Sequence, residues 1–186
     1  MNAAIDGQDL AGNAVAPAEC DDLLSDIVST FQDQCAQGIW ANDGIVNKQM
    51  GDGLMAIFNF PIKIERHAEA AVTAALDIQL RCKTRLAAVA KQVDEDVADT
   101  LGVGIGVHTG QVEIGEFSAA RSDFTAIGAT VNLSARLEAQ AAAGEILVSA
   151  ESATLAPGLT AGTSTRTLML KGIESPVLAH VVMAGG

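Results

Sequence analysis

The run from Ile45 to Phe58, IVNKQMGDGLMAIF, constrains the fold more than any other stretch of this sequence. Apolar and β-branched residues flank a Gly-Asp-Gly core, which predicts a β-hairpin with a tight turn. Gly51 and Gly53 can adopt the positive φ angles that such turns use. The hairpin would hold Asp52 at its tip, with Lys48 four residues earlier on the first strand. This pair suits a magnesium nucleotide, since Mg²⁺ takes few carboxylates together with phosphate oxygens; a surface hairpin with solvated charges is the alternative.

Composition indicates one acidic globular domain. The chain has 186 residues, 49% of them hydrophobic and 18% charged, which is enough apolar material for one core. The net charge of −12 argues against a nucleic-acid partner, because phosphate backbones are bound by basic surfaces. Cys20, Cys35 and Cys82 lack the spacing of a zinc or redox site, so we expect reduced thiols and a cytoplasmic protein. We expect neither a signal peptide nor a membrane segment.

Hydrophobic periodicity predicts an α+β fold with a mostly antiparallel sheet and helices on one face. Residues 1–17 are predicted as a loose arm or a degenerate first strand, and residues 18–186 as the folded domain. Beyond the first hairpin, the predicted elements are helices over Ala18–Asn42, Glu65–Lys91 and Ala129–Ala141, a hairpin over Leu101–Ile114 that turns near Thr109-Gly110, strands over Phe124–Ile127 and Glu145–Ser149, a helical turn over Glu151–Leu155, and a final strand pair over Thr163–Leu170 and Pro176–Met183. Alternating glycines after Leu101 indicate a strand closely covered by a helix.

Five collinear motifs carry a family resemblance that covers roughly Cys20 to Met183. They are VNKQMGDGLMAIF, GVGIGVHTGQVEIG, SDFTAIGATVNLSARLEA, GEILVS and LKGIESPV, in that order. Together they closely resemble the catalytic domain of class III nucleotidyl cyclases, the adenylate and guanylate cyclases. The resemblance implies a ferredoxin-like βααββαβ core and a head-to-tail homodimer with active sites at the interface. It also implies two Mg²⁺ (or Mn²⁺) ions per site, attack of the ribose 3′-hydroxyl on the α-phosphorus, and release of pyrophosphate.

The resemblance assigns roles to five residues. Asp52 matches a metal-binding aspartate. Lys48 and Thr125 match the two purine-selecting positions; a lysine donates to an adenine ring nitrogen, and a threonine hydroxyl accepts from the adenine amino group. Guanine-selective members usually carry an acidic residue at the lysine position. Asn132 and Arg136, four apart on one helix face, match the pair that positions the ribose and stabilises charge on the α-phosphate. For Thr125, an ordinary strand residue is the alternative.

Three further residues follow from the same resemblance. Lys171, in LKGIE, matches the lysine that grips the terminal phosphates, with a plain loop lysine as the alternative. Arg121 lies near a phosphate-contacting arginine, in a loop of variable length. His108 is a family landmark that we interpret as structural. The resemblance thus predicts an adenylate cyclase that converts MgATP to cyclic AMP.

The N-terminal stretch departs from the family pattern. The counterpart of the first metal aspartate is Asp9, in DLAGNA, but the preceding AAIDGQ makes a poor central strand. Either Asp9 lies on a degenerate strand or the metal site is incomplete, and a lost carboxylate would weaken the two-metal clamp. A cyclase-like regulatory module that binds nucleotide or dimerises without turnover is therefore the first rival. A diguanylate cyclase is the second, although MGDGLM lacks its Gly-Gly-Asp/Glu-Glu-Phe motif.

Overall fold

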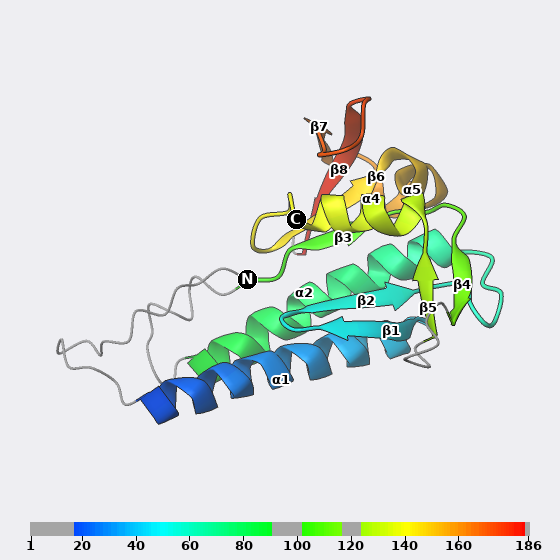
Figure 1. Ribbon diagram of the computed structural model, residues 1–186. Helices are drawn as coiled ribbons and strands as arrows, with labels where there is room; N and C mark the ends of the chain where they lie inside the picture. Colours follow the sequence, from blue (N-terminus) through cyan, green and yellow to red (C-terminus); the bar gives the residue numbers. More distant parts are fainter. Residues whose placement is uncertain (1–16, 91–101, 117–123, 185–186) are drawn as a thin grey trace.

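The structure, a computed structural model, describes residues 17–90, 102–116 and 124–184 (Figure 1). Helices and short strands alternate along these ranges, and four of the five strand pairs in them are antiparallel, which confirms the predicted α+β class. The helices are α1 (Pro17–Ala41), α2 (His67–Ala90), α4 (Ala129–Glu138), α5 (Ala150–Leu155) and α6 (Pro157–Thr160), and the strands are β1 (Ile45–Met50), β2 (Gly53–Ile57), β3 (Ile105–Val107), β4 (Glu113–Glu116), β5 (Phe124–Ile127), β6 (Glu145–Ser149), β7 (Ser164–Leu168) and β8 (Val177–Met183). None of the helices in the described ranges is long and apolar enough to span a membrane.

The predicted first hairpin forms as β1 and β2. Met50 pairs with Gly53, so the turn consists of Gly51 and Asp52 alone. Gly51 has φ +63°, a left-handed conformation that glycine adopts without steric cost, whereas Gly53 is not among the residues with positive φ. The register shifts between Val46 and Lys48, which makes the residue between them a β-bulge.

Helices α1 and α2 lie side by side and support this hairpin (Figure 1). Their contact is built from apolar side chains at helical spacing, and one face of the hairpin packs against it. The buried residues of this contact are Ile27, Phe31, Cys35, Ile39, Ile78, Cys82 and Leu86. Cys35 and Cys82 are free, as expected for reduced thiols, and their mutual hydrogen bond together with burial raises the pKa of Cys35.

A four-stranded sheet of order β3-β6-β8-β7 forms the rest of the core. Its central strand β6 is buried on both faces: Ile146 and Val148 pack against α2 and α5, while Leu147 packs against α4. Alternate residues of a strand point to opposite faces, so this pattern requires cover on both sides. The expectation of helices on one face was therefore wrong, because an apolar strand such as EILVS needs two layers around it.

The predicted hairpin over Leu101–Ile114 was also wrong. Strand β3 pairs in parallel with β6, and β4 pairs antiparallel with β5, so the two segments join different sheets. The predicted cover by a helix is confirmed, since a Cβ on Gly106 would lie under 3.0 Å from backbone atoms of Ser134 and Glu138 on α4. Parallel pairing places β3 at the edge of the four-stranded sheet beside the buried β6, where Val107 joins the core and α4 covers Gly106.

The remaining predicted elements form with small shifts of their bounds. Strands β7 and β8 pair antiparallel around Lys171 and Gly172, as expected for the final strand pair. Helix α4 ends at Glu138, before the predicted end at Ala141. Residues 1–16 of the predicted arm lie outside the described ranges, so the domain boundary near residue 17 stays a prediction.

Candidate active site

Asp52 lies exposed at the tip of the β1–β2 hairpin, as predicted. The turn is held from α1, where Gln32 Nε2 donates a hydrogen bond of 3.0 Å to the carbonyl oxygen of Gly51. The carboxylate therefore projects from a turn whose backbone is tied to a long helix. A carboxylate in such a position is a suitable oxygen ligand for a hard cation.

The bulge in β1 directs Lys48 away from the core. Val46 pairs with Ala56 and faces the α1–α2 core, but Lys48 pairs with Met55, whose side chain belongs to the opposite face of β2. Without the extra residue, Lys48 would lie two positions after Val46 on the same, buried face. The ammonium group is exposed, as a group that contacts a ligand has to be.

Asn47 is the bulged residue, and it links β1 to β5. Its Nδ2 donates to the carbonyl oxygen of Phe124 at 3.1 Å, and its Oδ1 accepts from the Thr125 hydroxyl at 3.0 Å. The backbone N–H of Ala126 lies 3.5 Å from the same Oδ1. The structure thus joins Thr125 by a hydrogen bond to Asn47, the residue directly before Lys48 on β1.

Sequence reasoning missed Asn47. The signal that could have found it is its residue type, because asparagine is disfavoured in strands and here stands in an apolar run directly before Lys48. A polar residue that breaks such a pattern indicates either a bulge or a buried polar contact, and the structure shows both.

Asn132 and Arg136 lie on the outer face of α4. Leu137 is fully buried against the sheet, and Ser134 Oγ donates to the carbonyl oxygen of Gly106 at 3.1 Å, which fixes the orientation of the helix. Asn132 and Arg136 are both exposed. Within the described ranges, neither side chain has a hydrogen-bond or ion-pair partner, so both polar groups are available to a ligand.

The other predicted residues are placed less completely. Lys171 is exposed in the turn between β7 and β8. Asp9 and Arg121 lie outside the described residues. The predicted residues that the structure describes fall into two groups. Lys48, Asp52 and Thr125 lie on the two-stranded ribbons β1–β2 and β4–β5. Asn132, Arg136 and Lys171 lie on α4 and in the β7–β8 turn. In Figure 1, β7 and β8 lie at the top, and the β1–β2 hairpin lies on the other side of the β3–α4 layer.

His108 belongs to a separate polar cluster at the end of β3. Its Nδ1 lies 2.8 Å from Ser149 Oγ, and the hydroxyls of Thr109 and Ser152 are also 2.8 Å apart. Burial lowers the pKa of His108, and the Glu151 carboxylate at 3.7 Å opposes this only in part. The imidazole is therefore neutral at pH 7 and joins β3 to the start of α5, which supports the prediction that His108 is structural.

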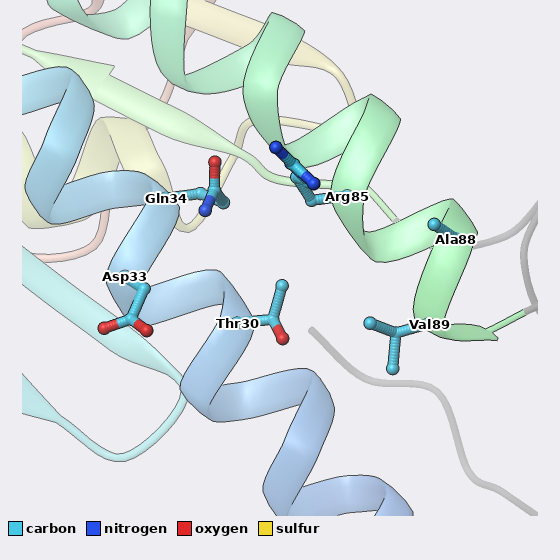
Figure 2. Close-up of a pocket in the computed structure, with 6 residues that line it drawn as sticks. All are labelled: Thr30, Asp33, Gln34, Arg85, Ala88 and Val89. Carbon is cyan, nitrogen blue, oxygen red and sulfur yellow. The ribbon is translucent and has the colours of Figure 1, made fainter.

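A hollow of about 360 Å³ lies between α1 and α2 (Figure 2). Thr30, Asp33 and Gln34 line it from α1, and Arg85, Ala88 and Val89 line it from α2. It contains none of the predicted site residues. The side chains with chemistry suited to a nucleotide instead lie on open surfaces of the chain.

The described ranges contain no group of three or more His, Cys, Asp and Glu side chains that could hold a metal ion. Asp52 alone supplies one carboxylate at the hairpin tip. A cation at this position would therefore need further oxygen ligands, which substrate phosphates, water or Asp9 could provide.

Comparison with known proteins identifies the family. The family model described as the adenylate and guanylate cyclase catalytic domain matches residues 3–183. Adenylate cyclase 1 of Rhizobium meliloti (strain 1021) is 32% identical over 124 residues, which are 66% of this chain and 17% of that protein. The chain therefore spans about a sixth of that relative's length.

Solved structures agree with this match. The crystal structure of the guanylyl cyclase Cya2 has a TM-score of 0.78 and 26% identity, and covers 87% of this chain and 81% of its own. The adenylyl cyclase CyaB from P. aeruginosa has a TM-score of 0.69 and 26% identity, with coverage of 92% and 85%. The hairpin, β5 and α4 described above thus occur within a cyclase fold, and the chain belongs to the adenylate and guanylate cyclase catalytic domain family.

Proposed function

We propose that this chain is an adenylate cyclase that converts MgATP to cyclic AMP and pyrophosphate in the cytoplasm. The observation that carries the choice of base is the arrangement of Lys48 and Thr125 around Asn47. The Lys48 ammonium is only a donor and suits a ring nitrogen of adenine, and the Thr125 oxygen can accept from the 6-amino group. Guanine presents an acceptor, O6, where adenine presents that amino donor.

In the proposed reaction the ribose 3′-oxygen attacks the α-phosphorus. One bond forms between these atoms, the bond from the α-phosphorus to the bridging oxygen of pyrophosphate breaks, and the 3′-hydroxyl proton passes to water. Arg136 stabilises the negative charge that develops on the α-phosphate, and Asn132 orients the ribose. Lys171 binds the terminal phosphates. All three side chains are exposed and extend from α4 or the β7–β8 turn.

Two divalent ions, Mg²⁺ or Mn²⁺, fit this proposal as partners of the substrate phosphates. When bound, they would neutralise phosphate charge and make the 3′-hydroxyl more acidic. Asp52 would hold them from the hairpin tip, and its oxygen chemistry fits such ions. Asp9 remains the predicted second carboxylate. Arg121 remains a predicted phosphate contact.

We propose that the site is completed in a homodimer. Asp52 and Lys48 are carried on the ribbons and Arg136 on α4, so one nucleotide would be enclosed by the ribbons of one subunit and α4 of the other. Exposed apolar side chains on the ribbons support a covered surface there: Met50 is 52% exposed and Phe124 is 48% exposed. Burial of such side chains favours association.

The test combines a turnover assay with subunit mixing. Purified chain is incubated with ATP or GTP and with Mg²⁺ or Mn²⁺, and cyclic AMP and cyclic GMP are measured. Asp52→Asn and Arg136→Ala are each expected to be inactive alone, and an equal mixture is expected to recover about a quarter of wild-type activity, since half the dimers carry one intact site. Preference for GTP would contradict the base assignment, and an inactive mixture would contradict the shared site.

A regulatory module that binds nucleotide without turnover is the second candidate. The observation that favours it is the lack of a three-ligand metal group in the described ranges. ATP binding by calorimetry, with no cyclic product under either metal, would establish this function in place of the first. Turnover with Mn²⁺ or Mg²⁺ that is lost in Asp52→Asn would exclude it.

A further inference from the structure

The orientation of the Asn47 amide is determined by its two backbone neighbours. The Phe124 carbonyl oxygen can only accept a hydrogen bond, and it lies 3.1 Å from Nδ2. The Ala126 N–H can only donate, and it lies 3.5 Å from Oδ1. A flipped amide would place donor against donor and acceptor against acceptor, so Oδ1 is the amide atom that faces the Thr125 hydroxyl and the Ala126 N–H.

This orientation determines what the Thr125 hydroxyl can do. The group has one proton, and Thr125 Oγ1 donates it to Asn47 Oδ1 at 3.0 Å. With its proton so used, the Thr125 oxygen offers only lone pairs to a ligand. A threonine hydroxyl without such an acceptor would rotate and could donate to one ligand and accept from another. Residues 47 and 125 are 78 positions apart, so this constraint exists only in the folded chain.

We propose that Asn47 is the positioning residue that sets the base preference of this site, by holding the Thr125 hydroxyl as an acceptor for the 6-amino group of adenine and against O6 of guanine. This inference rests on the proposed cyclase function. Asn47 does not itself touch the base in this scheme; it acts through Thr125. It also joins β1, the strand that carries Lys48, to β5, the strand that carries Thr125.

The chemistry predicts an asymmetric effect of removing Asn47. An oxygen restricted to accepting would oppose the guanine O6, because two acceptors would meet without a proton between them. In Asn47→Ala the Thr125 hydroxyl is free to turn and donate to O6, so GTP becomes a better ligand. The adenine contact also loses its fixed acceptor. We expect the ratio of ATP to GTP use to fall about 10-fold, which is the effect of losing one hydrogen bond of ordinary net strength.

The experiment measures this ratio in two backgrounds. Values of kcat/KM for ATP and GTP, and dissociation constants for 3′-deoxy-ATP and 3′-deoxy-GTP, are determined for wild type, Asn47→Ala, Thr125→Val and the double variant. Asn47→Ala is expected to lower the ratio in the wild-type background and to leave it unchanged in Thr125→Val, where no hydroxyl remains to be oriented. Asn47→Ser, whose hydroxyl is too short to replace the amide, gives a second measurement if Asn47→Ala folds poorly.

Asn42→Ala is the matched control. Asn42 Nδ2 donates to the Gly38 carbonyl oxygen at 2.8 Å at the end of α1, so this variant also removes one asparagine hydrogen bond, but away from the ribbons. We expect it to change thermal stability while the ATP to GTP ratio stays at the wild-type value. Thr125→Ser, which keeps the hydroxyl and its bond to Asn47, is expected to retain the preference for ATP.

Three outcomes would overturn the inference. If folded Asn47→Ala keeps the wild-type ratio, or if the ratio falls equally in the Thr125→Val background, Asn47 acts only on structure. In either case the cyclase function stands, because wild type still forms cyclic AMP. If wild type forms no cyclic product and binds neither 3′-deoxy nucleotide, the proposed function fails and this inference fails with it.

Discussion

The four-stranded sheet and the two-stranded ribbons differ in what holds them. In the sheet, β6 is covered on both faces, and Ile146, Leu147 and Val148 are all 0% exposed. Each of the ribbons β1–β2 and β4–β5 has only two strands, so it has edges that pair with no further strand. The Asn47 side chain bridges the two ribbons. Apolar burial thus dominates one region, and a few directional hydrogen bonds determine the geometry of the other.

This difference separates stability from function. Side chains buried in the sheet contribute to the free energy of unfolding and point at no ligand. Lys48 and Asp52 on the hairpin are exposed and bury little area, so a substrate can reach both groups. We therefore expect substitutions in the sheet to change stability, and substitutions on the ribbons to change activity, with little overlap.

The largest expected effect is in the sheet. Leu147→Ala removes a fully buried side chain between α4 and β8 and leaves a cavity, so we expect the free energy of unfolding to fall by about 2–5 kcal/mol in urea titrations. Leu178→Ala, on a side chain that is 43% exposed, is the control and is expected to cost far less. Similar losses in both variants would show that burial in the sheet does not determine stability.

The next effect is at the hairpin tip. Asp52→Asn removes one anion from the proposed cation site, so we expect turnover to fall about 10²- to 10³-fold. The free energy of unfolding is expected to change by less than about 1 kcal/mol, because the side chain is exposed. Asp26→Asn, an exposed carboxylate on α1, is the control for activity. A large loss of stability without loss of turnover would assign Asp52 a structural role.

A smaller effect is expected on the choice between ATP and GTP, at Lys48 on the same ribbon. Lys48→Glu replaces a donor with an acceptor, so we expect kcat/KM for ATP to fall about 10-fold more than that for GTP. Lys83→Glu, which reverses an exposed charge on α2, separates this effect from the change in net charge. An equal loss for both nucleotides would show that Lys48 does not contact the base.

The smallest expected effect is the loss of stability on removing an ion pair in the sheet. Arg166 on β7 binds Glu145 on β6 across β8, with Nη2–Oε1 at 2.6 Å and Nη1–Oε2 at 3.1 Å. Hydrogen bonds from Arg166 and from the Ala142 N–H hold the pKa of Glu145 below its usual value of 4.5. Since Arg166 is 39% exposed, we expect Glu145→Gln to cost only about 1 kcal/mol of unfolding free energy at pH 7.

The pH dependence of this loss follows from the lowered pKa. A carboxyl group whose pKa is lower in the folded state stabilises the fold above its unfolded pKa and loses that contribution as the pH falls through the folded pKa. The difference between wild type and Glu145→Gln is therefore expected to be full at pH 7 and to shrink as the pH drops below 4.5. Glu174→Gln, on an exposed carboxylate, serves as the control. A difference that is constant with pH would exclude the ion pair as its cause.

Features that depend on neighbouring residues could be predicted from the sequence. The Gly51-Asp52 turn, helices α1 and α2, and the β7–β8 pair all lie near their predicted positions, because turn chemistry and helical periodicity act over a few residues. The same local rules put Asn132 and Arg136 on one helix face. Local sequence patterns were therefore sufficient to predict most element types and the surfaces that carry the predicted site residues.

Contacts between remote segments could not be predicted from the sequence and became known from the folded structure. Strands β3 and β4 follow each other closely, yet they join different sheets, because β3 pairs with β6 and β4 pairs with β5. The partner of Asn47 is likewise remote in the sequence, since its side chain finds its acceptor on Phe124, 77 residues away. Strand pairing and polar bridges depend on which distant groups bury or satisfy one another, and that free energy exists only once the chain is folded.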